Sequence, residues 1–298
     1  MIAEHGKRYR FALSGSSARK LRRLEANLLA GRAVTRRFYP LIASELGFHC
    51  DLDALLATGC LPNVRSQPED AVDLLEAYVG TYLREEIQQE ALVKDTAAFS
   101  RFLEVAAICN GQVVNVAGIA RDAGVARPTV ARYFEALVDT MLGAWLPAWR
   151  PRARIKETQH PKFFLFDPGV VRGLAGRLRE PLESTERGPL METLVLHELR
   201  AAMEIQRIGG TLSYWRTPSG SEVDFIWERG KRRIGIEVKA AKQWRSEFAA
   251  PLSALLEEKQ VTSAVGVYAG KERLVDKGVR VFPFAEFARE LAEGRILA

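Results

Sequence analysis

The sequence predicts a multidomain α/β protein, and three observations carry this prediction. Apolar residues recur at helical spacing from Asp70 to about Val93 and again over residues 97–140. Residues 189–298 instead alternate short apolar strands with helices, which is the order of a mixed α/β sheet. The composition, with 47% hydrophobic and 27% charged residues, is that of globular domains, and 298 residues accommodate two or three of them.

The first predicted element is a strand over residues 8–14 that ends in the polar turn SGSS. Ser16 or Ser17 is expected to cap a helix over residues 18–30. A lone parallel strand exposes both faces, so this strand needs neighbours that nothing upstream supplies. Short helical stretches are expected to follow over residues 38–58.

Residues 97–140 carry the spacing of a helix-turn-helix. A helix over 97–109 precedes a short helix capped by Asn115, Gly124 makes the turn, and a third helix runs from about Arg127 to Thr140. Apolar residues beyond the third helix are expected to form the wing strands of such a motif, namely Met141, Leu142, Trp145 and Leu146.

Three exposed positions of the third helix are candidates for DNA contact: Arg127, Thr129 and Arg132. The same helix carries the acids Glu135 and Asp139, and helix-turn-helix units also serve as packing or protein-contact modules. Both interpretations of this helix therefore stay open.

A basic stretch over residues 150–161 is interpreted as an exposed linker or as an arm that follows phosphates. The next stretch, KFFLFDPGVV, predicts an aromatic strand closed by a turn at Asp167-Pro168-Gly169.

The C-terminal part is expected to form one mixed sheet. Its predicted elements are a helix over 190–206, the strands TLSYWRT, EVDFIWE and IGIEVKA, a helix over 247–259, the strands SAVGVYA and VRVFPF, and a closing helix.

Charged residues interrupt two of these apolar strands. Glu237 and Lys239 are two positions apart, so they lie on the same face of one strand, and Asp224 lies among apolar neighbours on the preceding strand. Buried charges are costly unless they are paired or bind a metal. Asp224 and Glu237 are therefore candidate Mg²⁺ ligands, with Lys239 stabilising the developing charge or orienting water. A buried salt-bridge cluster is the alternative.

This pattern resembles the PD-(D/E)XK nuclease fold. The stretch YWRTPSGSEVDFIWERGKRRIGIEVKAAK carries the similarity, and it implies that Asp224, Glu237 and Lys239 form a catalytic metal site. The resemblance also implies a helical acid, which is either Glu192 or Glu198.

The resemblance extends over nearly the whole chain. The stretches RYRFALSGSSARKL, LLAGRAVTRRFYPL and GPLMETLVLHEL look like predicted prokaryotic AAA-type ATPases that carry the domain of unknown function 4143. In that family the SGSS segment carries the sensor residue beside the nucleotide, which makes Ser14, Ser16 or Ser17 the candidate here.

The phosphate-binding loop GxxxxGK[ST] and the Walker B strand of that family are absent from the sequence. We therefore expect a truncated family member that does not hydrolyse ATP alone, with ATP binding only in a full-length member. The implied domains are an ATPase remnant over 1–65, a helical linker with a winged helix over 66–176, and a nuclease-like domain over 177–298.

The charge and hydropathy of the chain narrow its surroundings. Lys+Arg 43 against Asp+Glu 37 gives a net charge of +6, which is compatible with nucleic acid without requiring it. No apolar run approaches the ~20 residues of a membrane span, and the start resembles no signal peptide. We expect a cytoplasmic protein with no membrane contact.

Two functions follow from these observations. The first is phosphodiester cleavage of DNA with Mg²⁺ or Mn²⁺, and the alternative is a non-catalytic module that binds DNA or protein. The expected partners are DNA and either a second copy of the chain or a chain that supplies the missing ATPase half.

Overall fold

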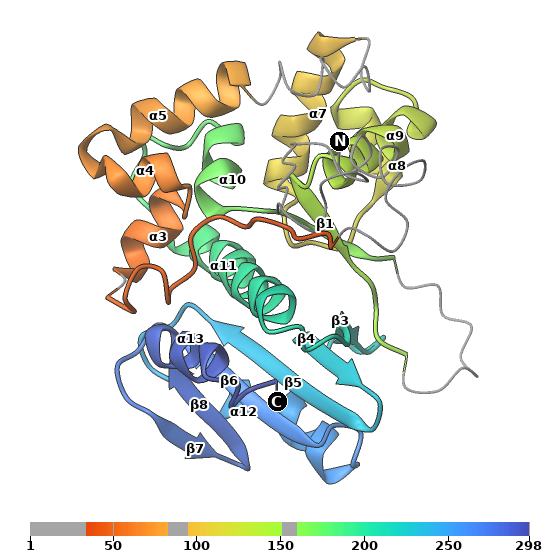
Figure 1. Cartoon of the computed structure of the whole chain (residues 1–298). Coiled ribbons are helices and arrows are strands. Elements are labelled where there is room, and N and C mark those ends of the chain that lie inside the picture. The colour runs from red at the N-terminus through yellow and green to blue at the C-terminus, as the bar shows by residue number, and fades with distance from the viewer. Residues whose placement is uncertain (1–33, 50, 83–94, 151–159, 298) are drawn as a thin grey trace, which may run out of the picture.

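The structure is a computed structural model that describes residues 34–49, 51–82, 95–150 and 160–297. Figure 1 shows a helical part, the long helix α11 beside it, and a sheet on the other side of α11. The predicted strand over 8–14, the helix over 18–30 and the candidates Ser14, Ser16 and Ser17 lie outside the described residues. Across the described residues, none of the helices combines the length and apolar character that crossing a bilayer requires.

The helical part begins with five short elements. They are α3 (Leu52–Thr58), α4 (Pro62–Ser66), the 3-10 turn η1 (Pro68–Asp70), α5 (Ala71–Ala77) and the π-helical turn η2 (Tyr78–Tyr82). Leu56 and Leu75 are fully buried in the core that these elements share with the rest of the chain.

The expected three-helix unit is present as α7 (Thr96–Ile108), α8 (Val116–Asp122) and α9 (Arg127–Asp139). The Asn115 side chain accepts a hydrogen bond of 3.1 Å from the Gly118 N–H, which caps α8. Gly124 has a φ of +66°, a conformation in which a Cβ is strained, and it makes the turn into α9. A capping residue thus fixes the start of α8, and a turn residue lies in its connection to α9.

A two-stranded ribbon follows α9. The strand β1 (Gly143–Leu146) pairs antiparallel with β2 (Lys162–Leu165), in the region where the sequence predicted wing strands. Aromatic rings join the ribbon to the helices, because Phe134 of α9 lies 4.9 Å from Trp145 and 4.6 Å from Phe163, measured between ring centroids.

The predicted turn at Asp167-Pro168-Gly169 is wrong, since these residues begin the helix α10 (Pro168–Leu174). The Asp167 carboxylate accepts from the Val170 N–H at 3.1 Å and from the Cys60 N–H at 2.6 Å, and burial raises its pKa to about 6. Pro168 occupies the first helical turn, where its missing N–H costs nothing. An Asp-Pro-Gly stretch suits a capped helix start as well as a turn, and packing against α3 decides between them.

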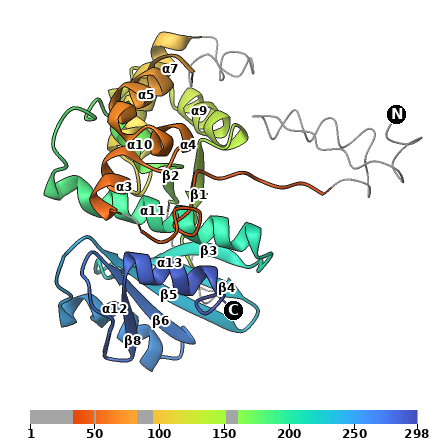
Figure 2. The ribbon, with the colours of Figure 1, turned by 60° about the vertical axis from the view of Figure 1, so that its left-hand side comes forward.

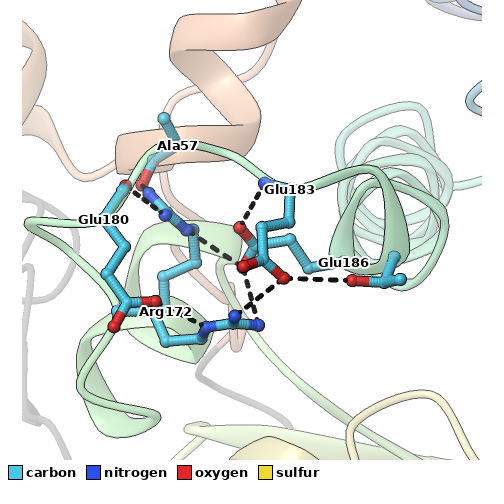
Figure 3. Close-up of polar contacts among 7 residues, drawn as sticks. Ala57, Arg172, Glu180, Glu183 and Glu186 are labelled. Carbon is cyan, nitrogen blue, oxygen red and sulfur yellow. Dashed lines mark hydrogen bonds and ion pairs between the residues drawn. The ribbon is translucent and has the colours of Figure 1, made fainter.

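Arg172 of α10 joins three segments of the helical part (Figure 3). Its guanidinium donates to the carbonyl of Glu180 at 2.8 Å and of Ala57 at 3.3 Å, and to the Glu186 carboxylate at 3.2 Å. The side chain is buried, so each of these partners replaces lost hydration.

Replacing Arg172 by methionine is expected to lower the free energy of unfolding by about 3–5 kcal/mol. The change keeps the side-chain length but leaves Glu186 and two carbonyl groups without their buried donor. Urea unfolding followed by circular dichroism measures the loss. Arg179→Met is the matched control, because that exposed arginine pairs with Asp73 and Glu76 at the surface and its loss has little effect. An equal loss in both variants would contradict the prediction.

The helix α11 (Ser184–Ile205) starts six residues before its predicted start. Glu183 and Glu186 form a capping box, in which each side chain bonds to the backbone N–H of the other residue. The helix packs against α3 and α10 on one side and against the sheet and α13 on the other. It therefore lies at the junction of the helical part and the sheet (Figures 1 and 2).

The sheet has six strands in the order β3-β4-β5-β6-β8-β7. Its strands are β3 (Thr211–Arg216), β4 (Glu222–Arg229), β5 (Arg232–Lys239), β6 (Ser263–Tyr268), β7 (Leu274–Asp276) and β8 (Val279–Pro283). The first three strands pair antiparallel, β5, β6 and β8 pair parallel, and β7 pairs antiparallel with β8. The mixed α/β class is thereby confirmed, and β7 is a short edge strand that the sequence did not indicate.

Helices cover both faces of this sheet. α11 and α13 (Phe284–Ala292) contact β5, β6 and β8 from one side (Figure 2). The crossover helix α12 (Ser246–Glu257) packs on the other side of the sheet. Leu252 of this helix lies so close to the backbone of Gly235 that a side chain at Gly235 would clash with it. The strands β4 and β5 are thus buried on both faces, which explains their apolar sequences.

Candidate functional site

The site begins where the strands β4 and β5 part. Their backbone pairing is continuous from Arg229↔Arg232 to Phe225↔Ile236 and then stops. Beyond this point the Val238 N–H donates to the Asp224 side chain, at 2.7 Å, rather than to the backbone of β4. The carboxylate therefore lies between two diverging strands and satisfies a buried donor there.

A bulge in β4 explains why Asp224 can turn into this gap. Between the pairs Ser213↔Ile226 and Trp215↔Val223, β4 advances three residues while β3 advances two. One extra residue therefore stands opposite Tyr214, which is how a β-bulge redirects a side chain. The Tyr214 backbone bonds to the segment after β1, because its N–H donates to Pro147 at 2.9 Å and its carbonyl accepts from Trp149 at 2.6 Å.

Glu237 and Lys239 lie side by side at the end of β5, as their spacing of two requires. The Lys239 ammonium is 2.5 Å from Glu237 Oε1, whereas Glu237 Oε2 is buried and has no hydrogen-bond partner among the described residues. Burial, followed by the charge of Asp224, raises the pKa of Glu237 well above its ordinary value. Half of this carboxylate is thus available to another donor or to a cation.

The structure distinguishes the two candidate helical acids. Glu192 interacts with Asp224 and Lys239, and burial, followed by the charge of Asp224, raises its pKa to about 8. Glu198 is six residues further along α11, about 120° around the helix, and its carboxylate instead accepts from the Ala43 N–H at 2.7 Å. Glu192 joins Asp224, Glu237 and Lys239, and Glu198 does not.

Lys162 is a member of the cluster that sequence reasoning missed. It belongs to β2 of the helical part, yet its ammonium lies 2.5 Å from a Glu222 carboxylate oxygen and 3.7 Å from one of Glu192. The ammonium also lies 5.3 Å from the ring centroid of Tyr214. A lysine at the start of the aromatic run KFFLF was the available signal, because a lysine in a buried strand requires a partner.

Carboxylates outnumber cations in this cluster, which we call the carboxylate cluster. It comprises Asp224, Glu237, Glu192 and Glu222 together with Lys162, Lys239 and, at the rim, Arg216. Burial raises the pKa of Asp224 as well as those of Glu192 and Glu237, so protons partly balance the excess negative charge.

The carboxylate cluster offers oxygen donors, which are the ligands that Mg²⁺ and Mn²⁺ prefer. Within the described ranges, no three His, Cys, Asp or Glu side chains already stand as a metal-ligand group. Mg²⁺, however, is commonly held by one or two carboxylates and keeps several waters. Asp224 and Glu237, with the unpartnered Oε2 of Glu237, fit this mode of binding.

The buried Glu198 predicts a pH dependence of stability. Burial raises its pKa to about 7, so the folded chain keeps a proton that the unfolded chain loses near pH 4.5. Its contribution to stability is therefore complete below about pH 4.5 and is lost as the pH rises through 7. We expect the free energy of unfolding of Glu198→Gln, measured with urea, to rise relative to that of the wild type as the pH increases. The difference between the two proteins should grow by about 2 kcal/mol from pH 5 to pH 8. Glu104→Gln on the surface of α7 is the control, and a pH-independent difference for Glu198→Gln would refute the assignment.

The candidate DNA-contact residues lie together at the start of α9. Arg127 and Arg132 are exposed, and Arg132 donates to the Thr129 hydroxyl at 3.2 Å. In a helix-turn-helix this end of the second helix meets the bases, so the positions are geometrically suitable.

Two known families match the chain in separate regions. Residues 50–180 match the family described as "Domain of unknown function (DUF8612)", and residues 187–287 match "Domain of unknown function (DUF4143)". The likeness to the second family agrees with the resemblance noted in the sequence.

The chain is also similar to two curated bacterial proteins. They are an uncharacterized protein of Mycobacterium bovis and an uncharacterized protein of Mycobacterium tuberculosis, each 28% identical over 271 residues, which is 89% of this chain. The matched region is 59% of either relative, so the chain spans about three fifths of their length. No solved structure matches the chain.

Proposed function

We propose that the carboxylate cluster is a site for phosphodiester cleavage of DNA that depends on Mg²⁺ or Mn²⁺. The observation that carries the proposal is the unpartnered, buried Oε2 of Glu237 in a cluster where carboxylates exceed cations. The element order also supports it, because a helix acid, a strand Asp and a Glu-x-Lys strand converge as the nuclease resemblance implies.

The roles of the side chains follow from their contacts. Asp224 is held in place by the Val238 N–H, and Glu237 by Lys239, so both carboxylates are oriented before any ligand arrives. A bound divalent cation would lower the pKa of water and neutralise charge on the phosphoryl oxygens. Lys239, which is partly exposed, is the group placed to hold an attacking water or a phosphate oxygen. Glu192 is placed to accept a proton once it is ionised, at a pH above its raised pKa of about 8.

We further propose that the three helices and the ribbon form a winged helix that delivers DNA. Support comes from the exposed Arg127 and Arg132 at the start of α9 and from Lys162, which extends from the ribbon into the carboxylate cluster. The resemblance to AAA-type ATPases supports action within an assembly, either of several copies or with an ATPase partner, and sedimentation with and without ATP and DNA tests this.

A non-catalytic DNA- or protein-binding module is the second candidate. The observation that favours it is Lys162 itself, because its buried ammonium already supplies a positive charge to Glu192 and Glu222. In that case the carboxylate cluster is a structural ion-pair network.

Incubation of supercoiled plasmid and branched DNA with Mg²⁺ or Mn²⁺ distinguishes the two functions. We expect nicking by the wild type and by Lys271→Ala, an exposed lysine outside the cluster, and loss of nicking in Asp224→Ala and Lys239→Ala. Equal product in the wild type and both cluster variants would dismiss the catalytic function. A gel-shift titration at several salt concentrations tests DNA binding, since contacts to phosphates give a steep salt dependence.

A further inference from the structure

A cavity of about 300 Å³ lies where the segment over residues 34–39, β1, α11 and the start of β3 meet. Figure 1 shows that segment, in red, running past α11 toward β1. Asp224, Glu237 and Lys239 do not line the cavity, so it is distinct from the carboxylate cluster. Its volume is at the lower end of the ~300–1,000 Å³ range of small-molecule sites.

Two arginines give the cavity a positive wall. Arg200 of α11 lies with its guanidinium 5.7 Å from the Tyr39 ring centroid, and Arg37 lines the same space. Among the described residues, no carboxylate forms an ion pair with either arginine. Burial, and to a smaller extent the charge of Arg37, lowers the pKa of Arg200. A guanidinium held in such surroundings is stabilised by an anion, and phosphate suits its planar set of donors.

Another part of the lining is aromatic. Trp145 of β1 stays 38% exposed although it is a large apolar side chain. The rings of Phe134 and Phe163 pack against it, each at a centroid distance of 4.9 Å, so the indole is held rigidly. A rigid, half-exposed indole is a stacking surface for a planar ring.

One acidic group completes the lining. Glu204 lies one helical turn beyond Arg200 on α11 and also lines the cavity. A carboxylate in the lining of a cavity can accept hydrogen bonds from amino or hydroxyl groups of a ligand.

We propose that this cavity binds a nucleotide, with Arg37 and Arg200 holding its phosphate and Trp145 stacking on its base. The cavity combines an anion site, a stacking surface and a hydrogen-bond acceptor, and a nucleotide carries the three complementary groups. The inference goes beyond the proposed cleavage, because the cavity binds its ligand whether or not the carboxylate cluster is catalytic.

The same chemistry comes from a free nucleotide or from an unpaired nucleotide of a DNA strand. Arg200 is eight residues from Glu192, about 12 Å along α11 at 1.5 Å per residue. The cavity and the carboxylate cluster are therefore separated along α11 by a distance that a few nucleotides of a strand can span.

The test is calorimetry of the whole chain as Asp224→Asn, in which cleavage is removed. The titrants are 2′-deoxyadenosine 5′-monophosphate, deoxyadenosine and a short oligothymidylate. Arg37→Ala, Arg200→Gln and Trp145→Leu are added singly to this background. Arg36→Ala is the matched control, because its exposed guanidinium donates to the neighbouring Thr35 carbonyl, at 2.9 Å, and is not among the residues that line the cavity.

We expect the monophosphate to bind, and each of the three cavity variants to weaken this binding at least tenfold. Arg36→Ala should change it less than twofold, and deoxyadenosine should bind at least tenfold more weakly. Oligothymidylate binding tenfold more tightly than the monophosphate supports a strand as the source, and the reverse order supports a free nucleotide.

Two results would overturn the proposal. One is the absence of measurable binding of both the monophosphate and the oligonucleotide to a chain that melts as the wild type does. The other is an equal affinity in Arg37→Ala and Arg36→Ala. Because Arg37 is exposed, Arg37→Ala is expected to fold. This variant therefore tests nucleotide binding even if Arg200→Gln is destabilised.

Discussion

Asp224→Asn is expected to weaken metal binding strongly while it stabilises the metal-free protein. The asparagine oxygen can still accept from the Val238 N–H, but one of the buried negative charges disappears. Glu192 and Glu237 then ionise more easily, and the unfolding free energy at pH 8 should rise by roughly 1 kcal/mol. Calorimetry should show Mg²⁺ or Mn²⁺ affinity reduced at least about 100-fold, since a ligand itself is lost.

This opposite change of stability and binding distinguishes a functional site from a structural one. In a structural ion-pair network, removal of the Asp224 charge takes away a negative charge that acts on Lys239 and Lys162, and the loss lowers stability. Asp276→Asn, on the edge strand β7 and outside the cluster, serves as the control: the asparagine oxygen can still accept the 3.1 Å hydrogen bond from the Trp244 indole, so neither quantity should change much. A destabilised Asp224→Asn with unchanged metal affinity would refute the proposed site.

Lys162→Met is expected to destabilise the protein strongly, and Mg²⁺ is expected to restore much of the loss. Methionine keeps the apolar stem of the side chain but removes the buried charge that faces Glu192 and Glu222. Loss of one partner of a buried pair costs about 3–5 kcal/mol. A divalent cation bound by Asp224 and Glu237 would return positive charge to the cluster, so the melting temperature of the variant should rise more with Mg²⁺ than that of the wild type.

Lys162→Arg and the double variant Lys162→Met/Glu222→Gln are the comparisons for this experiment. Lys162→Arg keeps the charge, so this variant should lose less stability than Lys162→Met. The double variant should lose less stability than the two single variants lose together, because the side chains of Lys162 and Glu222 are in contact. A Lys162→Met protein that is destabilised and does not respond to Mg²⁺ would show that the lysine acts only as a structural counter-ion.

Lys162 also connects the two halves of the chain. It extends from the ribbon of the helical part to acids of α11 and β4, and the segment after β1 bonds to Tyr214 at the edge of the sheet. If α9 binds DNA as proposed, we expect the binding to change the position of Lys162 in the carboxylate cluster, because the aromatic rings of the ribbon pack on α9.

Local spacing determined much of the fold. Caps and turn residues such as Asn115 and Gly124 placed α8 and α9 within a few residues, because these signals act between near neighbours in the chain. The two-residue period of a strand likewise placed Lys239 beside Glu237. Where a local signal suits two structures, as at Asp167-Pro168-Gly169, the sequence predicted the wrong one.

Only the tertiary structure decided which distant residues share a site. The approach of α11 to the sheet selected Glu192 over Glu198, since the two acids face different sides of one helix. The path of β2 brought Lys162 to acids that follow it by 30 or more positions, and the meeting of α11 with β1 created the cavity around Arg200. Such contacts depend on how whole elements pack against one another, and residue spacing along the chain carries no information about that packing.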